Sequence, residues 1–363
     1  MKRLKNFMCI AMLVLLFLTF ICPTVAGEEN TVDANQISHG GQTITILDDR
    51  GQYITIPYPV QRVVFLVENA MNSMYAVGGA EKISGIGNIW MLDKKEPFFR
   101  AIDPDFDSKP KIKDTNGDID LRALSQIKPD LVVLWSADWN DEMTTAIKDQ
   151  LRVPVYGVYY TKLSDVSRAN SVYAKMIGDE NRESGVASIM AEYTKKVTDK
   201  TSGLQDNERP TVYWMWGDIY GTAGINSATN EVIRLAGGRN VIETADIIGK
   251  SDEHPVLNLD TLKKLNPDVI YLWYNEEVNP SDILRGEGDF SQWKDLKAVK
   301  TGRVYEVADP FVYDSFSPQQ PLALMAVAKD LHPDLFTDIN LPDLIDSFFV
   351  SMYNIHYPSY QSA

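Results

Sequence analysis

Residues 121–135, LRALSQIKPDLVVLW, carry a pattern that recurs at residues 259–273 as LDTLKKLNPDVIYLW. Each copy carries apolar residues at positions i, i+3 and i+6, then a Pro-Asp pair, then a continuous apolar run that ends on tryptophan. The spacing predicts a short amphipathic helix, the Pro-Asp pair a turn, and the unbroken apolar run a strand buried on both faces. The sequence therefore predicts an α/β fold with two similar lobes, each a largely parallel sheet flanked by helices.

The segments around the two copies predict how the chain is divided. Residues 164–204 have apolar positions at helical spacing with a break at Gly178-Asp179, so a long helix is predicted from about residue 180 to residue 201. We expect an N-terminal lobe at 42–162, a helical linker at 163–205 that joins the lobes through this long helix, and a C-terminal lobe at 206–357. A helical connection is stiff, which would limit large domain closure.

Local patterns predict the remaining elements of each lobe. A β-hairpin is expected around residues 49–51, and a long loop that includes Phe98 and Phe99 is expected after residue 86. The other predicted strands are 62–67, 83–86, 153–158, 211–216 and 304–307, and the other predicted helices are 69–77, 228–236, 321–331 and 341–353.

The N-terminus has the composition of an export signal. A basic start, the apolar run at residues 8–22 and small residues around position 26 predict a signal peptide at residues 1–26. An uncleaved membrane anchor is the alternative interpretation, because the run at 7–26 has about the 20 residues that a bilayer span needs. Pro23 and the following Thr-Val-Ala favour cleavage, so we expect an extracytoplasmic protein.

Cysteine usage and charge exclude several classes of function. The two cysteines, Cys9 and Cys22, lie in the predicted leader, so the mature chain would have no disulfide, thiolate metal site or cysteine nucleophile. Loss of residues 1–26 removes three cations and no acid, which takes the net charge from −15 to −18. An acidic surface of this kind repels nucleic acid and anionic lipid.

Aromatic residues gather at predicted strand ends, where ligands bind in open parallel sheets. Large rings with a polar tip suit a bulky planar or apolar ligand held between two lobes. Two polar side chains in the same segments, Asn69 and Arg100, could orient such a ligand. The predicted ligand-binding residues are Asn69, Trp90, Arg100, Trp135, Trp139, Trp214, Trp216, Tyr220, Trp273, Tyr274, Phe311 and Tyr313.

No catalytic or metal site is predicted. The four histidines show no metal-ligand spacing, and the chain lacks HExxH, GxSxG, P-loop and GxGxxG motifs. Residues 114–120 resemble a calcium loop superficially, but the glycine stands at the fourth place and no glutamate closes the loop. We interpret this segment as a turn and N-cap for the helix at residue 121.

The order of these patterns over residues 42–352 resembles the helical-linker, class III substrate-binding proteins of ABC importers for iron siderophores, haem and corrinoids. The shared order is a strand, a Gly-Gly helix stop, a P-D-(L/V)-(V/I) repeat, a helical connector, LAGGRNV at 235–241 and a second P-D-V-I. Further matches are RVV at 62–64, WKDL to RVY at 293–305 and LMAVAKDLHPDLF at 324–336.

The resemblance implies a bilobed receptor that captures a metal chelate in its cleft and delivers it to a membrane permease with its ATPase. In this family a carboxylate near the start of the Pro-Asp helix of each lobe docks onto the permease. Asp260 occupies that place in the second lobe, whereas the first lobe has Arg122 there. Docking of the first lobe would then need Asp118 or Asp120 as a substitute.

The cargo is left open among several classes. Aromatic residues dominate the predicted cleft and Arg100 is its clearest base, which favours an iron siderophore, followed by a corrinoid or haem. Relatives that bind molybdate or tungstate keep the same fold, so the fold does not decide the ligand. We expect no intrinsic cofactor and a monomer, and the alternatives of other class are an enzyme such as a chelatase or a membrane-anchored sensor.

Overall fold

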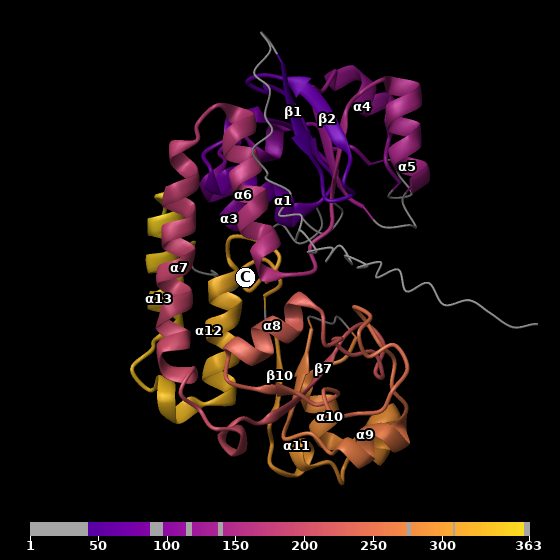
Figure 1. Cartoon of the computed structure of the whole chain (residues 1–363), viewed down its shortest axis with the longest axis vertical. Helices are drawn as coiled ribbons and strands as arrows, with labels where there is room; N and C mark the ends of the chain where they lie inside the picture. The colour runs from indigo at the N-terminus through magenta and orange to yellow at the C-terminus, as the bar shows by residue number, and fades with distance from the viewer. Residues whose placement is uncertain are drawn as a thin grey trace, which may run out of the picture. The chain divides into compact units, whose positions relative to one another are not determined.

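A computed structural model describes residues 43–87, 97–113, 118–136, 141–273, 277–307 and 309–358. The predicted leader lies outside these ranges. The described residues form two four-stranded parallel sheets flanked by helices, together with one antiparallel hairpin (Figure 1). None of the helices in these ranges has the length and apolar character that a membrane crossing requires.

The hairpin and the N-terminal sheet come first in the chain. Strands β1 (Thr43–Leu47) and β2 (Tyr53–Pro57) pair antiparallel, and Gly51 takes the positive φ of 72° that their turn requires. The sheet has the strand order β4-β3-β5-β6, and all its pairs are parallel. Its strands are β3 (Val63–Phe65), β4 (Ile83–Ile86), β5 (Leu131–Trp135) and β6 (Val155–Val158).

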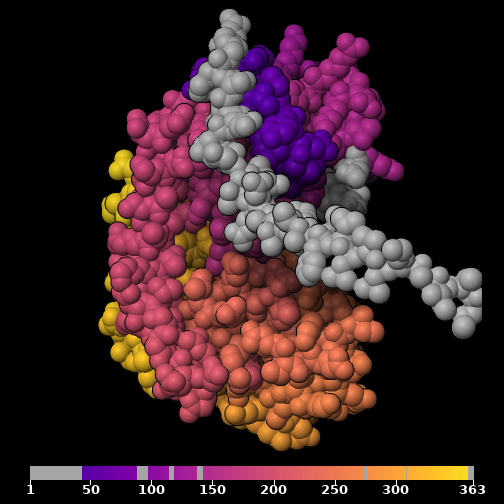
Figure 2. Space-filling view, viewed as in Figure 1, coloured from indigo at the N-terminus to yellow at the C-terminus, as the bar shows by residue number. Residues whose placement is uncertain are grey.

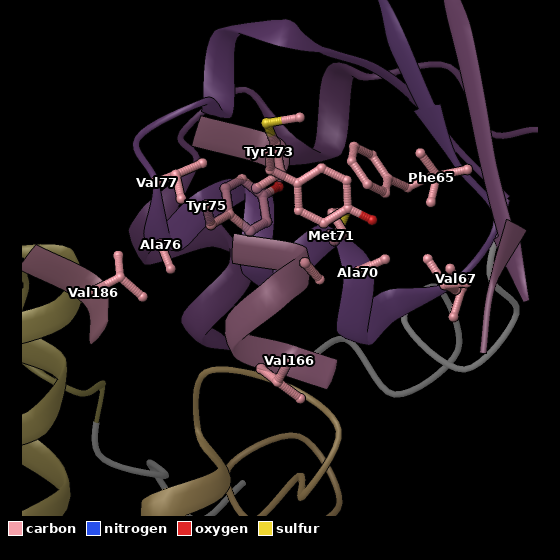
Figure 3. Close-up of a cluster of buried hydrophobic side chains, with 14 of the residues drawn as sticks. Phe65, Val67, Ala70, Met71, Tyr75, Ala76, Val77, Val166, Tyr173 and Val186 are labelled. Carbon is pink, nitrogen blue, oxygen red and sulfur yellow. The ribbon is translucent and has the colours of Figure 1, made fainter. Parts of the chain in front are cut away.

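Alternate residues of these strands face two different cores, as the pleat of a strand requires. Phe65 and Val133 lie in the core that contains helices α1 (Glu68–Ala76) and α6 (Leu163–Ile177). Figure 3 shows Phe65 of this core beside Tyr173 of α6, with ring centroids 6.0 Å apart. Val64 and Val132 face the opposite core, under helix α4 (Leu121–Ile127). Both faces are therefore covered, which explains the unbroken apolar runs.

The C-terminal sheet repeats this arrangement with the order β10-β9-β7-β8. Trp214 and Tyr271 face helices α8 (Ala228–Leu235) and α12 (Gln320–Leu331), whereas Tyr213 and Ile270 face the opposite core. The strands are β7 (Thr211–Met215), β8 (Arg239–Asn240), β9 (Val269–Leu272) and β10 (Val304–Glu306), and all pairs are parallel.

The repeated sequence forms the same local structure twice. Helix α4 begins at the N-cap Asp120 and helix α9 (Leu259–Leu265) begins at the N-cap Asn258, each with a side-chain oxygen that accepts backbone N–H groups. Both helices end on a left-handed residue, Lys128 at φ 52° and Asn266 at φ 44°. These findings confirm the predicted helix, turn and strand in both copies, and the predicted N-cap.

The aspartates of the two Pro-Asp pairs also have the same function in both halves. Asp130 Oδ2 accepts hydrogen bonds from the backbone N–H groups of Gln61 and Arg62, just before β3. Asp268 Oδ2 accepts from the backbone N–H and the hydroxyl of Thr211, the first residue of β7. Asp130 therefore holds the start of β5 next to the start of β3, and Asp268 holds the start of β9 next to the start of β7.

One long helix packs into both halves. Helix α7 (Asn181–Thr201) follows α6 after Gly178, which takes a left-handed φ of 80°. Its Met190 lies in the N-terminal core and its Val197 in the C-terminal core. It packs along α12 and α13 (Leu341–Tyr353), as Figures 1 and 2 show for the pink and yellow segments.

The structure corrects the prediction for residues 98 and 99. They belong to helix α3 (Pro97–Ile102), which begins with proline at the first helical position, rather than to a loop. Both phenylalanines are fully buried, because Phe98 packs edge-on against Phe349 of α13 and Phe99 stacks on Phe106. Contacts with residues far along the chain thus determine this helix.

The remaining elements are short. They are the helices α5 (Asp141–Ala146), α10 (Pro280–Arg285) and α11 (Lys297–Lys300), a π-helical turn (Ile147–Leu151), and 3-10 turns at Ala80–Lys82, Phe106–Ser108, Asp206–Glu208, Gly288–Gln292 and Pro333–Phe336.

Candidate ligand-binding site

Segments that follow strands of the two sheets contact each other. The hydroxyl of Tyr159, which follows β6, donates a 3.2 Å hydrogen bond to Glu253 Oε2 in the segment before α9. Trp135, the last residue of β5, packs edge-on against Phe316, which follows β10, with ring centroids 6.1 Å apart. Because ligands of open parallel sheets bind at the carboxyl ends of the strands, this contact region is the candidate site.

Three rings stack at the carboxyl end of the C-terminal sheet. Trp216, directly after β7, stacks on Trp273, directly after β9, with centroids 5.0 Å apart and planes 26° apart. Trp216 also stacks on His254, at 4.7 Å and 10°. Both tryptophans are partly exposed. Trp216, Trp273 and His254, called the ring stack below, offer flat apolar area to a ligand.

His254 is a site residue that the sequence analysis missed. Burial lowers the pKa of His254, and the negative charge of Glu253, whose Oε1 lies 3.6 Å from His254 Nε2, opposes this effect. The ring is therefore neutral at neutral pH, which suits stacking on an indole. No local sequence pattern marks His254, because the segment that carries it reaches Trp216 only in the folded chain.

Trp135 provides the aromatic group of the N-terminal sheet at this end. Its partly exposed ring packs edge-on against Tyr159 at 5.7 Å and Tyr160 at 5.9 Å. The hydrogen bond from Tyr159 to Glu253 then connects this group to the residue next to His254. The structure thus brings Trp135, Trp216 and Trp273, all predicted as ligand-binding residues, into one contact region.

Other predicted residues lie in cores. Phe311 is 2% exposed and packs edge-on against Phe99 of the N-terminal core, at 5.6 Å. Trp214 is 3% exposed and stacks on Tyr271 at 4.9 Å. Tyr220 is partly exposed but lies against Trp293 of a separate core, at 6.1 Å. The pleat of a strand and the path of the following loop decide whether such a ring points into a core. The spacing of residues in the sequence does not determine either of them.

Arg100 already has a carboxylate partner. Its Nε and Nη2 donate hydrogen bonds of 2.8 and 2.7 Å to the two oxygens of Asp107, and these hydrogen bonds lower the pKa of Asp107. The guanidinium also lies 5.5 Å from the ring of Phe106. An anionic ligand would therefore have to compete with Asp107 for Arg100.

Asn69 lies near the start of α1, directly after β3. Its side chain is 8% exposed, and Oδ1 has no hydrogen-bond partner among the residues that the structure describes. The buried Asp314 lies close enough to the neighbouring Glu68 to feel its charge. Burial chiefly raises the pKa of Asp314 to about 7, and a hydrogen bond from the backbone N–H of Phe316 opposes the shift.

Tyr313, from the same segment as Asp314, is partly exposed and packs against both the N-terminal and the C-terminal core. The predicted residues Trp90, Trp139 and Tyr274 lie outside the described residues. Within those residues, no three histidine, cysteine or carboxylate side chains come together in a group that could hold a metal ion.

The two positions implied for docking are both solvent-exposed. Asp260 lies in the first turn of α9 and Arg122 in the first turn of α4. Asp120 is committed to capping α4, because its Oδ1 accepts from the backbone N–H groups of Arg122 and Ala123 at 2.8 and 2.9 Å. Asp118, in contrast, is exposed. The two Pro-Asp helices thus match in backbone and differ in surface charge.

Comparisons with known proteins agree with this fold. The chain is 25% identical over 349 residues to the iron(3+)-hydroxamate-binding protein YxeB of Bacillus subtilis, covering 92% of this chain and 96% of that protein. The solved structure of the molybdate-bound protein MolA of Haemophilus influenzae superposes with a TM-score of 0.70 at 20% identity, over 86% of this chain and 99% of that one. A periplasmic solute binding protein of Veillonella parvula gives a TM-score of 0.68 at 22% identity, over 87% and 94% of the two chains.

The sequence also matches a family as a whole. Residues 63–310, about two thirds of the chain, match the family described as "Periplasmic binding protein". This match spans the two parallel sheets and the connecting helices, and it confirms the resemblance inferred from the order of the sequence patterns. The chain therefore belongs to the periplasmic binding proteins that serve ABC importers, in their class III, TroA-like group.

Proposed function

We propose that this periplasmic binding protein captures an iron-siderophore-type metal chelate at the contacting carboxyl ends of its two sheets. The observation that carries the proposal is the ring stack of Trp216, Trp273 and His254, which lies next to the Tyr159–Glu253 hydrogen bond. A metal chelate presents a large, partly apolar surface, and flat rings bind such a surface without needing a matching charge. The likeness to an iron(3+)-hydroxamate-binding protein supports the same ligand class.

Binding in this proposal needs contacts from both sheets and no covalent chemistry. The N-terminal sheet contributes Trp135 and the C-terminal sheet contributes the ring stack. A ligand that contacts the carboxyl ends of both sheets at once binds the closed conformation more tightly, and therefore shifts the protein population toward the closed state. Helix α7 packs into both cores, so we expect closure to be modest.

Delivery would use a permease and its ATPase. Asp260 is the proposed docking residue, because it is exposed in the first turn of α9. The first turn of α4 carries Arg122 at the matching place, and the exposed Asp118 is the carboxylate nearest in sequence that does not cap this helix. We propose that docking is asymmetric, with the C-terminal half providing the main acidic contact.

Native mass spectrometry of the mature chain tests the ligand class. The protein is incubated with a ferric hydroxamate, ferric citrate, haem, cobalamin and molybdate, one at a time, and the bound mass is read directly. The proposal expects one ferric chelate bound per chain, and the Trp216→Leu variant should retain a smaller fraction of the complex at the same ligand concentration. A chain that retains molybdate alone would contradict it.

Molybdate is the second candidate, because the molybdate-bound MolA structure shares the fold over most of both chains. A small oxyanion is held by hydrogen-bond donors rather than by rings, so its binding should be insensitive to Trp216→Leu. Corrinoid and haem use the same aromatic surface as a siderophore, and the mass distinguishes them.

We further propose that residues 1–26 form an export signal and that the mature protein is an extracytoplasmic monomer. Both cysteines lie in this segment, so the mature chain would contain none. The mass of the exported protein tests the cleavage point. Retention of residues 1–26 would favour an anchored receptor.

A further inference from the structure

A cavity of about 130 Å³ lies between the C-terminal sheet and the helices α8 and α12. Residues of β7, β9 and β10 form one wall, and residues of the two helices form the other. Figure 1 shows α8 and α12 on this side of the sheet. Cavities of about 150 Å³ hold a benzene-sized guest, so this one has room for a single small group.

Four aromatic rings line the cavity. They are Trp214, Tyr271, Trp273 and Tyr313. Trp214 and Tyr271 stack on each other at 4.9 Å, which fixes the positions of both rings. Trp273 has a double role, because it lines this cavity and also stacks on Trp216 in the ring stack. The electron-rich faces of such rings attract cations, most strongly where water is excluded.

The charged residues of the lining are all acidic. They are Asp330 of α12 and Glu306 of β10, and the lining includes no lysine, arginine or histidine. Asp330 Oδ2 accepts a 2.9 Å hydrogen bond from the hydroxyl of Tyr271. The described residues give Asp330 no ion-pair partner. The carboxylate of Asp330 therefore has a negative charge that the neutral hydroxyl of Tyr271 satisfies only in part.

The cations near Asp330 are held by other groups. Arg303 Nη2 donates to the carbonyl oxygens of Asp330 and Leu331, at 3.4 and 2.8 Å, and Lys329 Nζ donates to two carbonyl oxygens at 2.9 Å. Their charges oppose the effect of burial, but burial still raises the pKa of Asp330 to about 6. A buried carboxylate with this pKa is stabilised when a cation enters the cavity.

We propose that this cavity is a second ligand site, which binds a small quaternary ammonium group of trimethylammonium size. Such a group has a positive charge and no hydrogen-bond donors, so it needs an acidic, aromatic cavity and few acceptors. A metal ion would need several oxygen ligands in a shell, which an aromatic lining does not offer. An anion would be repelled by the two carboxylates of the lining. A neutral guest would add no positive charge to balance the carboxylate of Asp330.

Binding at this cavity would also act on the candidate site. A guest that contacts Trp273 restricts the ring that stacks on Trp216. The proposal predicts that a cation in the cavity changes the fluorescence of the chain, because Trp214 and Trp273 both line it. This site is independent of which cargo the ring stack binds, so it does not rest on the proposed ligand.

Isothermal titration of the full mature chain with choline tests the proposal. The control ligand is the uncharged carbon isostere of choline, in which a tert-butyl group replaces the trimethylammonium group. At about pH 8, where Asp330 is ionised, choline should bind at least about tenfold more tightly than its isostere. At about pH 5, below the pKa of Asp330, this preference should fall by about threefold or more and persist in part, because the aromatic rings still attract the cation.

The variant Asp330→Asn retains an oxygen that can accept from Tyr271 and removes the charge. It should bind choline at least about tenfold more weakly at pH near 8 and leave the affinity for the isostere unchanged. The matched control is Asp334→Asn, an exposed carboxylate beyond the end of α12, which should bind choline like the unmodified chain.

Three results would overturn the proposal: equal affinity for choline and its isostere, unchanged choline affinity in Asp330→Asn, or no binding at concentrations on the order of 10 mM. The isostere and pH comparisons use the unmodified chain, so the proposal can still fail if the asparagine variant does not fold.

Discussion

The hydroxyl of Tyr159 donates a 3.2 Å hydrogen bond to Glu253 Oε2, and the two residues belong to segments at the carboxyl ends of different sheets. Tyr159 is exposed and Glu253 is partly exposed, so this bond contributes little to global stability, at most about 1 kcal/mol. The location of this hydrogen bond matters more than its strength, because Glu253 directly precedes His254 of the ring stack. The bond therefore links the N-terminal sheet to the segment that carries part of the site.

The variant Tyr159→Phe should loosen this segment without unfolding the chain. We expect faster amide hydrogen exchange in residues 244–257, with a melting temperature within a few degrees of the unmodified protein. Tyr53→Phe serves as the matched control, because Tyr53 is 65% exposed on the hairpin. Unchanged exchange in residues 244–257 would show that the bond does not hold the segment.

The variant Trp216→Leu should reduce cargo affinity far more than stability. Trp216 is partly exposed, and in the proposal its ring packs on the cargo; an aromatic contact contributes about 0.5–1.5 kcal/mol beyond the area that it buries, so a loss of affinity of about tenfold is expected. Trp293→Phe is the control variant, because Trp293 is fully buried in a core away from the ring stack. It should lower the unfolding free energy by about 2 kcal/mol and leave cargo affinity unchanged. Equal effects of both variants on binding would argue against the ring stack as the site.

Asp314 should make the protein less stable as the pH rises from about 4 to about 7. Burial raises its pKa from 3.8 to about 7, so the folded state holds a proton that the unfolded state has lost across this window. The resulting stability is fully present below about pH 4 and is lost as the pH rises through 7, up to about 4 kcal/mol.

Urea denaturation of Asp314→Asn at both ends of this range measures the effect. The variant should be more stable than the unmodified chain at about pH 8 and should show a flatter pH dependence. The exposed Asp289→Asn is the control and should retain the original slope. If Asp314→Asn also retains that slope, another group causes the pH dependence.

Reversal of charge at Asp260 should weaken transport and spare ligand binding. Asp260 is exposed on the first turn of α9 and lies outside the ring stack, so Asp260→Lys should bind the cargo like the unmodified chain. Uptake through the permease should fall by about tenfold or more, because an acidic contact becomes repulsive. Arg122→Glu tests the first half, and it should preserve or increase uptake. Loss of cargo affinity in Asp260→Lys would contradict the docking role.

The repeated pattern was enough to predict the core of each half. Continuous apolar runs predict β5 and β9, and in the structure both strands are covered by helices on two faces. The helices α4, α7 and α13 also follow from apolar spacing, and α4 in addition from its N-cap. These elements are predictable because their own residues determine both the periodicity and the ends.

Elements that depend on distant partners were not predicted. Helix α3 is stabilised by the contacts of Phe98 and Phe99 with Phe349 and Phe106, and strand β8 has only the two residues Arg239 and Asn240. His254 enters the site because a long segment returns to Trp216. Trp135, Trp216 and Trp273 lie in the contact region, whereas Phe311, which was predicted by the same strand-end position, lies in a core.

Tryptophan fluorescence titration reports on the proposed ligand site itself, because Trp135, Trp216 and Trp273 all lie there. The mature chain is titrated with a ferric hydroxamate, haem, cobalamin and molybdate, in parallel with Trp216→Leu. We predict saturable quenching by the ferric chelate with a dissociation constant on the order of 1 μM or below, and a weaker response in the variant. Saturation by molybdate alone, or an identical response of both proteins to the ferric chelate, would contradict it.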